Sequence, residues 1–484
     1  MNVLLVRPRP DPRSINLQRF MICEPLELEV VAGHLQRLGH AVDLVDLILE
    51  RRPLAWFLRR KRYDVVGFTG YINHVQVIRQ LARTVRAEQP DARVVVGGVH
   101  AEVVPSDFDD PAIDHVLWAN GAATLGEIAS GLGSDEASAL PGVWGHGKPR
   151  PAAKHPSGML PDRAITARYR DRYNYIYHDH CATLKTSFGC PFTCRFCFCT
   201  QVCDYAERDL EEVMDELAAI PEPNVFIVDD DFLSRPSRVR AFCRALDERG
   251  ITRKFIAFGR ADFIVRHPEE VRLLAAHGFE AFFVGLESFR AGELDDYDKR
   301  TSVEQNVAAV RVLEAAGVQC YSGLITGPDW NRHDFDELIG FLNTFEHPMV
   351  NIQPITPMPG TPLYDDELPN LTLPREQAER WDMAHLAFAP SALSPRAYYW
   401  HLLRTYWSTS ASAPQRRHLR ERYGTRVYRR VRRGAVGITW QYLKLIIAPG
   451  SPAAPHTPVE PAPARRLSII PASAGMPARS GDEA

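Results

Sequence analysis

The sequence predicts an α/β protein in which two consecutive parallel β/α units are followed by a helical C-terminal region. Two patterns indicate this fold class. Over residues 2–147, runs of consecutive apolar residues such as "NVLLVR", "DVVGFTG" and "ARVVVGG" alternate with amphipathic stretches, as expected for strands buried on both faces of a parallel sheet. From about residue 176, the strand-then-helix pattern repeats six times, which is typical of a parallel barrel or partial barrel.

The first unit, residues 1–147, is expected to be a doubly wound, Rossmann-like domain. Such sheets bind ligands beyond the carboxyl ends of their strands. Two of the loops at these ends begin at Thr69 ("TGY") and at Gly97 ("GGVHA"). Because glycine has no Cβ, the Gly97-Gly98 pair allows a ligand or another backbone to approach closely.

The remaining boundaries follow from changes in composition. Residues 148–175 are expected to link the two units, and residues 176–368 to form a (β/α)6 partial TIM barrel whose first strand is "TLKTSF". Catalytic groups of such barrels lie at the carboxyl ends of the strands. Residues 369–447 have a helical pattern with many aromatic side chains, and residues 448–484, rich in proline, alanine and serine, are predicted to be disordered.

Composition excludes several classes of protein. A net charge of -3 over 484 residues gives no global reason to expect a nucleic-acid partner. The opening "MNVLLVRPRP" is too short an apolar run for a signal peptide, and no run approaches the length of a membrane span, so a cytoplasmic protein is expected. Nine cysteines at scattered spacings do not resemble a disulfide framework, and clustered thiols in a reducing compartment more often bind metal or perform redox chemistry.

Three of these cysteines, Cys190, Cys194 and Cys197, form a C-x3-C-x2-C pattern directly after the first barrel strand. Thiolates at this spacing can converge on one cubane cluster, whereas a structural zinc site normally shows a fourth ligand. Three ligands for four irons leave one iron open. A zinc knuckle or three buried thiols is the alternative. Cys199 and Cys203 follow the motif and are expected to be packing residues.

The motif, with Phe196 between its last two cysteines, resembles that of the radical S-adenosylmethionine (radical SAM) superfamily. The resemblance implies that Cys190, Cys194 and Cys197 bind a [4Fe–4S] cluster and that S-adenosylmethionine chelates the open iron. In that family, one electron from the cluster breaks the sulfonium bond to give a 5'-deoxyadenosyl radical. Such an electron requires a low-potential cluster. A flavodoxin or ferredoxin is the electron donor that the resemblance implies.

Strand-end motifs of the same family follow in order: "VDDDF", "GRAD", "GLES" and "GLITG". The resemblance implies that the side chains contacting S-adenosylmethionine are Phe196, Asp230, Arg260, Glu287 and Ile325. Arg260 would pair with its carboxylate as a permanently charged fork, and Ile325 would pack on adenine. Trp330 stands where the family usually has an acid. No catalytic acid, base or nucleophile is assigned.

A doubly wound domain before such a barrel resembles the cobalamin-binding subgroup. The resemblance implies that the residues contacting cobalamin are Thr69, Gly70, Gly97, Gly98 and His100. The D-x-H-x-x-G motif that supplies a cobalt ligand elsewhere is absent, and "NGAATL" (120–125) replaces the usual acidic stretch. His74 and His100 are either axial ligands or hydrogen-bonded loop residues.

The commonest activity in this subgroup is methylation of an unreactive carbon, so a methyltransferase acting on a lipid or natural-product intermediate is expected. A radical cyclase or rearrangement enzyme is the alternative, and a non-catalytic cobalamin or metal sensor is a third. Residues 416–447 join an arginine-dense stretch to an apolar one. They are expected either to touch an anionic membrane surface or to form a solvated helix followed by a docking helix.

Overall fold

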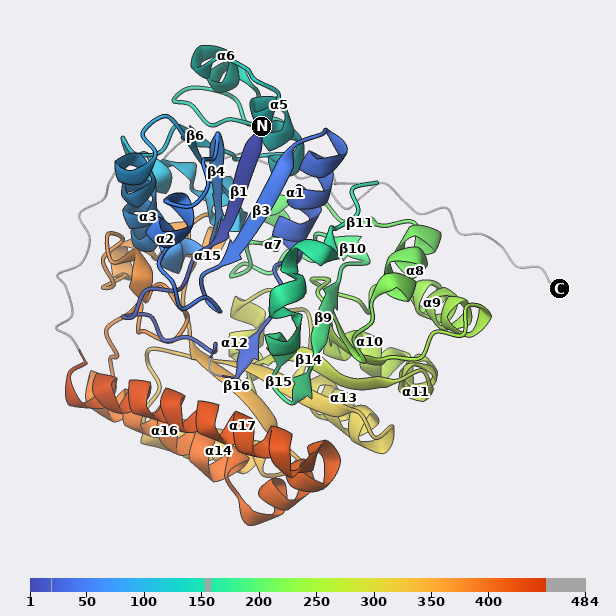
Figure 1. Cartoon of the computed structure of the whole chain (residues 1–484). Coiled ribbons are helices and arrows are strands. Elements are labelled where there is room, and N and C mark those ends of the chain that lie inside the picture. The colour runs from blue at the N-terminus through green and yellow to red at the C-terminus, as the bar shows by residue number, and fades with distance from the viewer. Residues whose placement is uncertain (19, 153–157, 450–484) are drawn as a thin grey trace, which may run out of the picture.

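The computed structural model describes residues 1–18, 20–152 and 158–449, and the predicted disordered tail therefore lies almost wholly outside the described residues. Figure 1 shows two sheets, with the N-terminal one (blue) above the barrel sheet (green to orange) and two long helices along the lower edge. Both units are parallel α/β folds, as predicted. Among the residues described, no helix combines the length and apolar character needed to cross a bilayer.

The N-terminal sheet has five parallel strands in the order β3-β1-β4-β5-β6. They are β1 (Asn2–Arg7), β3 (Ala41–Asp46), β4 (Val65–Thr69), β5 (Arg93–Gly97) and β6 (His115–Val116). The helices between and after them are α1 (Leu26–Arg37), α2 (Leu54–Leu58), α3 (Val75–Glu88), α4 (Val99–Val103), α5 (Gly121–Ala129) and α6 (Ser134–Ala139). Separate apolar clusters cover the two faces of the sheet, which explains why its strands read as continuous apolar runs.

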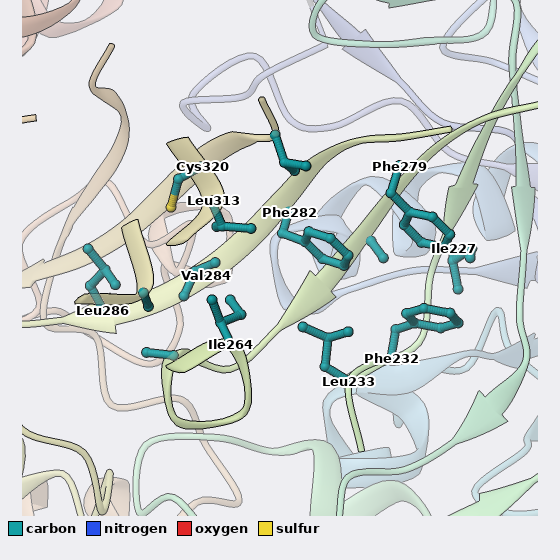
Figure 2. Packing of buried hydrophobic residues seen from close by; sticks show 14 of the residues in the cluster. Ile227, Phe232, Leu233, Ile264, Phe279, Phe282, Val284, Leu286, Leu313 and Cys320 are labelled. Carbon is teal, nitrogen blue, oxygen red and sulfur yellow. The ribbon is translucent and has the colours of Figure 1, made fainter. Parts of the chain in front are cut away.

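The second sheet is a six-stranded, all-parallel partial barrel in the order β16-β15-β14-β13-β12-β9. Its strands are β9 (Cys181–Leu184), β12 (Asn224–Ile227), β13 (Lys254–Gly259), β14 (Phe279–Glu287), β15 (Gln319–Thr326) and β16 (Met349–Pro354). The covering helices are α8 (Leu210–Ala219), α9 (Pro236–Glu248), α10 (Ala261–Arg266), α11 (Pro268–Ala276), α13 (Val303–Ala315) and α14 (Arg332–Leu342). Figure 2 shows the core between strands and helices, where the ring of Phe279 stacks on Phe282 (centroids 5.5 Å apart) and on Phe232 (5.2 Å).

The predicted first barrel strand is interrupted. "TLKTSF" divides into β9 and a two-residue strand β10 (Ser187–Phe188), which pairs with β11 (Ala206–Glu207). The interruption has a local cause, because the buried carboxylate of Asp229 accepts hydrogen bonds from the Thr186 amide (2.6 Å) and from the Thr186 hydroxyl (2.5 Å). The Thr186 amide is therefore not available to a neighbouring strand.

Three smaller elements surround the rim of the barrel. They are α7 (Cys199–Val202), α12 (Ala291–Asp296) and α15 (Pro362–Glu367). Helices α16 (Pro395–Ser410) and α17 (Ala413–Ile447) follow and pack against each other. The Tyr406 hydroxyl of α16 bonds to both the N–H (2.8 Å) and the C=O (2.7 Å) of Ile352 in edge strand β16. Helix α16 thus covers a strand edge that would otherwise offer free backbone groups.

A buried ion-pair network joins the two units. In the segment predicted as a linker, the 3-10 helix η3 (Arg163–Arg172) supplies two arginines. Arg163 bonds to Glu24 of the N-terminal unit (2.8 Å) and to Glu216 of α8 in the barrel (2.6 Å). Arg170 also bonds to Glu24 (2.6 Å). Because these groups are largely withdrawn from water, losing one partner would leave an uncompensated buried charge, so the network fixes one unit against the other.

Candidate active site

The three motif cysteines lie in the loop between β10 and α7, and each thiol is free and partly exposed. The loop starts at Gly189, whose φ is +63° and whose missing Cβ would lie 2.6 Å from the Asp204 carbonyl oxygen. Only glycine fits there. Arg195 ties the loop to the rim, because its guanidinium bonds to Asp366 (2.6 Å) and its C=O accepts the Leu363 amide (3.1 Å).

Within the described residues, no three His, Cys, Asp or Glu side chains converge on one point as ligands of a single metal ion would. A cubane places its thiolates on different irons, so its protein ligands lie further apart than those of a zinc ion. Cys190, Cys194 and Cys197 are the residues that would hold such a cluster, by their C-x3-C-x2-C motif.

Two buried cations lie beside this loop. The guanidinium of Arg260, at the end of β13, lies 3.7 Å from the ring centroid of Phe192 inside the motif and donates to the Lys299 carbonyl (2.8 Å). Burial raises the pKa of the Cys194 thiol, and the charges of Lys299 and Arg260 oppose that rise. Both cations therefore favour the thiolate form that binds iron.

Lys299 was not anticipated from the sequence. Its ammonium donates to Glu287 Oε1 at 2.6 Å, and the two side chains are only 8% and 12% exposed. Glu287 ends β14 in a left-handed conformation with φ +60°, which is unusual for a residue with a side chain. A Cβ on Gly285 would lie 2.2 Å from Glu287 Oε1. The "GLES" motif therefore combines a glycine that makes room with an acid that Lys299 holds in place.

The three aspartates after β12 occupy different positions. Asp229 holds the start of the cysteine loop, as described above. Asp231 is buried with Oδ2 unpartnered, and burial raises the pKa of its carboxyl to about 7. Asp230 is exposed and accepts a hydrogen bond from Cys199 Sγ at 3.3 Å. Of the three, only Asp230 has an exposed side chain. Cys199, which was expected to be a packing residue, donates to it.

Phe196 and Ile325 share apolar neighbours although 129 positions separate them in the sequence. Both pack against a small apolar cluster of Tyr297, Ile355 and Leu363, and the Phe196 ring lies edge-on to Tyr297 at 5.7 Å. Trp330, in place of the family's acid, is a core residue: it is 1% exposed and donates through Nε1 to Glu293 (2.8 Å). Phe196 and Ile325, both predicted to contact S-adenosylmethionine, thus pack against one apolar cluster, while Trp330 is turned inward.

The glycine-rich loops of the N-terminal unit also converge. Thr69 and Gly97 are register partners at the ends of β4 and β5. Gly98 has φ +93°, and a Cβ there would lie 2.5 Å from Thr69 Oγ1 and 3.0 Å from the Gly70 nitrogen. Thr69, Gly70, Gly97 and Gly98 therefore form one close-packed backbone cradle at this rim.

The two histidines considered as cobalt ligands both have partners. His100 is buried, with Nε2 2.5 Å from Asp107, and Asp107 also pairs with Arg375. This contact commits one ring nitrogen of His100 to the protein. His74 accepts a hydrogen bond from the Tyr71 amide through Nδ1 (3.1 Å), and burial lowers the pKa of its imidazole to about 4. His74 is therefore neutral near pH 7.

Tyr71, next to the cradle, lies near enough to the barrel for one of its carboxylates to act on it. Its side chain is 59% exposed, yet burial and the charge of Glu27 raise the pKa of its phenol to about 12, with Asp230 of the barrel adding to the rise. On another side of this interface, Gly360 after β16 lies against Val103 of α4, so the carboxyl-end rims of the two sheets face each other.

Comparisons with known proteins agree with this arrangement. The family model "Radical SAM superfamily" matches residues 184–342, and "B12 binding domain" matches residues 13–129. The hopanoid C-3 methylase of Methylococcus capsulatus is 31% identical over 418 residues, which cover 84% of this chain and 79% of that protein. The chain belongs to the cobalamin-binding radical SAM family.

Two further comparisons define the range of the family. The anaerobic magnesium-protoporphyrin IX monomethyl ester cyclase of Cereibacter sphaeroides is 23% identical over 77% of this chain and 64% of its own length. Among solved structures, the cobalamin-dependent S-adenosylmethionine radical enzyme OxsB, with aqua-cobalamin and S-adenosylmethionine bound, superposes with a TM-score of 0.67 over 92% of this chain and 72% of OxsB, at 17% identity. That likeness shows the shared fold. As a member of the family, the chain is an enzyme that uses a [4Fe–4S] cluster, S-adenosylmethionine and cobalamin.

Proposed function

We propose that this radical SAM enzyme is a cobalamin-dependent C-methyltransferase whose substrate is a lipid of the hopanoid kind. The observation that carries the proposal is the similarity to hopanoid C-3 methylase, which extends through both β/α units. The site supports it, because the cysteine loop and the glycine cradle lie on rims that face each other.

The residues present fit the three cofactors. Cys190, Cys194 and Cys197 offer three free thiols, and the cradle of Thr69, Gly70, Gly97 and Gly98 offers backbone that side chains would otherwise fill. When bound, the cofactors supply radical and methyl-transfer chemistry, which the protein itself does not provide. His100 would support the cradle through Asp107 rather than ligate cobalt.

The chain's own residues would bind and orient. Arg260 and Lys299 bring two positive charges to the thiols and to the place where an amino-acid carboxylate would bind. Asp230 is an exposed carboxylate suited to an ammonium group, and Glu287 is held in place by Lys299. Phe196 and Ile325 offer an apolar surface to adenine. We expect the substrate to lie between the two rims, beside the exposed side chain of Tyr71, where the enzyme would shield it from bulk water.

The test is turnover by anaerobically reconstituted enzyme with a hopanoid, using flavodoxin or ferredoxin as electron donor. We expect 5'-deoxyadenosine, S-adenosylhomocysteine and a methylated lipid. Cys194→Ala is the matched negative control. If a panel of polycyclic lipids yields no methylated product while S-adenosylmethionine is still cleaved, the lipid-methylase proposal is wrong.

A radical cyclase or rearrangement enzyme is the second candidate, favoured by the similarity to the cyclase of Cereibacter sphaeroides. It would form 5'-deoxyadenosine without S-adenosylhomocysteine. A non-catalytic sensor would not cleave S-adenosylmethionine even with dithionite. Either enzyme would work in the cytoplasm, where flavodoxins and ferredoxins supply low-potential electrons.

A further inference from the structure

Helices α16 and α17, which pack against each other, both expose large apolar side chains. Trp400 and Trp407 of α16 are 45% and 40% exposed, and Val436, Trp440 and Ile447 of α17 are 64%, 59% and 68% exposed. They make up half of the exposed large apolar residues found in the described part of the chain. We call these five side chains the indole band. Such a concentration marks an interaction surface rather than chance exposure.

The indole band faces away from the barrel. On α17, Val436, Trp440 and Ile447 are spaced four and seven residues apart, so they lie on one face. The buried residues of the same helix segment, Val431, Gly434 and Tyr442, lie on the opposite face. On α16, Trp400 and Trp407 are seven residues apart with ring centroids 5.8 Å from each other. Figure 1 shows both helices together along one outer edge of the molecule.

The same face of α17 continues as a row of positive charge. Arg426, Arg429 and Arg433, here called the arginine row, precede Val436 at the same three- and four-residue spacing and are all exposed. Within the described part of the chain, none of the three has an ion-pair or hydrogen-bond partner, in contrast to Arg430, which bonds to Asp179 and Asn174. Guanidinium groups without partners beside exposed indoles match an anionic, partly apolar surface.

We infer that this face docks on an anionic phospholipid bilayer, with the indole band at the level of the headgroups and the arginine row on lipid phosphates. Tryptophan is enriched at membrane interfaces because its ring is apolar and its N–H is polar. A second copy of the chain fits this face less well, because pairing of two such faces would bury the arginine row without partners. The inference goes beyond the proposed function and does not depend on it.

Flotation of the purified full-length holoenzyme with vesicles tests the inference. The vesicles are phosphatidylglycerol mixed with phosphatidylcholine, and phosphatidylcholine alone as a neutral control. Each arginine near an anionic surface contributes about 1 kcal/mol, so Arg426→Ser/Arg429→Ser/Arg433→Ser should weaken binding about 100-fold. Trp400→Ser/Trp407→Ser/Trp440→Ser should weaken it at least about tenfold and remove the quenching of fluorescence by brominated lipid. Salt should weaken binding of the wild type.

Matched controls distinguish vesicle binding by this face from nonspecific vesicle binding. Arg37→Ser/Arg51→Ser/Arg62→Ser removes three exposed charges elsewhere, and Leu38→Ser removes an exposed apolar side chain of the N-terminal unit; both should bind like wild type. Equal binding by wild type and both sets of α16 and α17 variants would overturn the inference. A dimer that the tryptophan variants abolish, without vesicle binding by the wild type, would also overturn it and identify a second copy as the occupant. No cofactor or turnover is needed, so this result is independent of the methyltransferase test.

Discussion

Substitution of Lys299 tests how the strand-end acid of the barrel is held. In Lys299→Met the ammonium is lost while the carboxylate of Glu287 stays buried, with its side chain only 12% exposed. Removing one partner of a buried ion pair costs about 3–5 kcal/mol, because the other charge is left uncompensated. Glu287 also holds a left-handed backbone conformation (φ +60°), and such strain persists only while its surroundings enforce it.

For a unit of this size, 1 kcal/mol corresponds to a change in melting temperature of about 2–4 °C. Lys299→Met should therefore lower the melting temperature of the barrel by about 6–20 °C, as measured by calorimetry. Lys61→Met is the control, because its pair with Asp43 is exposed on both sides (42% and 41%) and such pairs contribute about 0–1 kcal/mol.

A double-mutant cycle isolates the pair itself. Glu287→Gln alone should cost a similar amount, since it leaves the ammonium buried without its carboxylate. The double variant Lys299→Met/Glu287→Gln should recover most of the loss, because neither charge remains. If the losses of the single variants simply add, or if Lys299→Met behaves like Lys61→Met, Lys299 does not position Glu287 and the reasoning is refuted.

Three further predictions follow from single contacts. Gly189→Ala should prevent cluster incorporation, because the new Cβ would lie 2.6 Å from the Asp204 carbonyl oxygen. Iron content and visible absorbance measure the incorporation. Gly292→Ala, whose Cβ would have no atom within 4 Å, is the control and should incorporate the cluster normally. Gly98→Ala should reduce the cobalamin retained after gel filtration, because its Cβ would lie 2.5 Å from Thr69 Oγ1, whereas Gly121→Ala, in open space, should not. Burial lowers the pKa of His74 to about 4 from its usual 6.5. The neutral ring therefore contributes its full share to the free energy of unfolding above pH 6.5. That share, at most about 3 kcal/mol, is lost as the pH falls towards 4. In His74→Gln, the free energy of unfolding should depend less on pH between 6.5 and 4. An unchanged pH dependence would contradict the burial of a neutral ring.

The fold could be predicted from the sequence because each strand has a recognisable pattern. Strands buried on both faces appear as unbroken apolar runs, and each barrel strand ends in a short motif such as "GRAD" or "GLES". The division of "TLKTSF" into β9 and β10 was not predictable, since it depends on a carboxylate 43 positions away, Asp229, that captures the Thr186 amide. A side-chain cap of this kind leaves no periodic pattern in the sequence.

Predictions about the site came from residue types with one chemical use and from family motifs. Three cysteines at C-x3-C-x2-C predict a cluster, and family motifs predict that Phe196 and Ile325 contact S-adenosylmethionine. Lys299 escaped prediction because "DYDKRT" is an ordinary polar loop, and only folding over the rim brings its ammonium to Glu287. The protein contacts of His100, which is predicted to contact cobalamin, were not predictable, because its partner Asp107 is held by Arg375, 268 positions away in the sequence. Contacts of that range are not encoded locally.

The position of the candidate reaction space explains why the ion-pair network at Arg163 and Arg170 is buried. The groups proposed for the site come from both units: Tyr71 from the N-terminal loops and Asp230 from the barrel. Their separation is therefore set by how the units are docked, not by either fold alone. An exposed salt bridge would fix that separation weakly. Glu24, which is 3% exposed and bonded to both arginines, fixes it more firmly at the cost of desolvation. Because small displacements of reacting groups reduce rates steeply, such a network belongs at the junction of two units that must share one site.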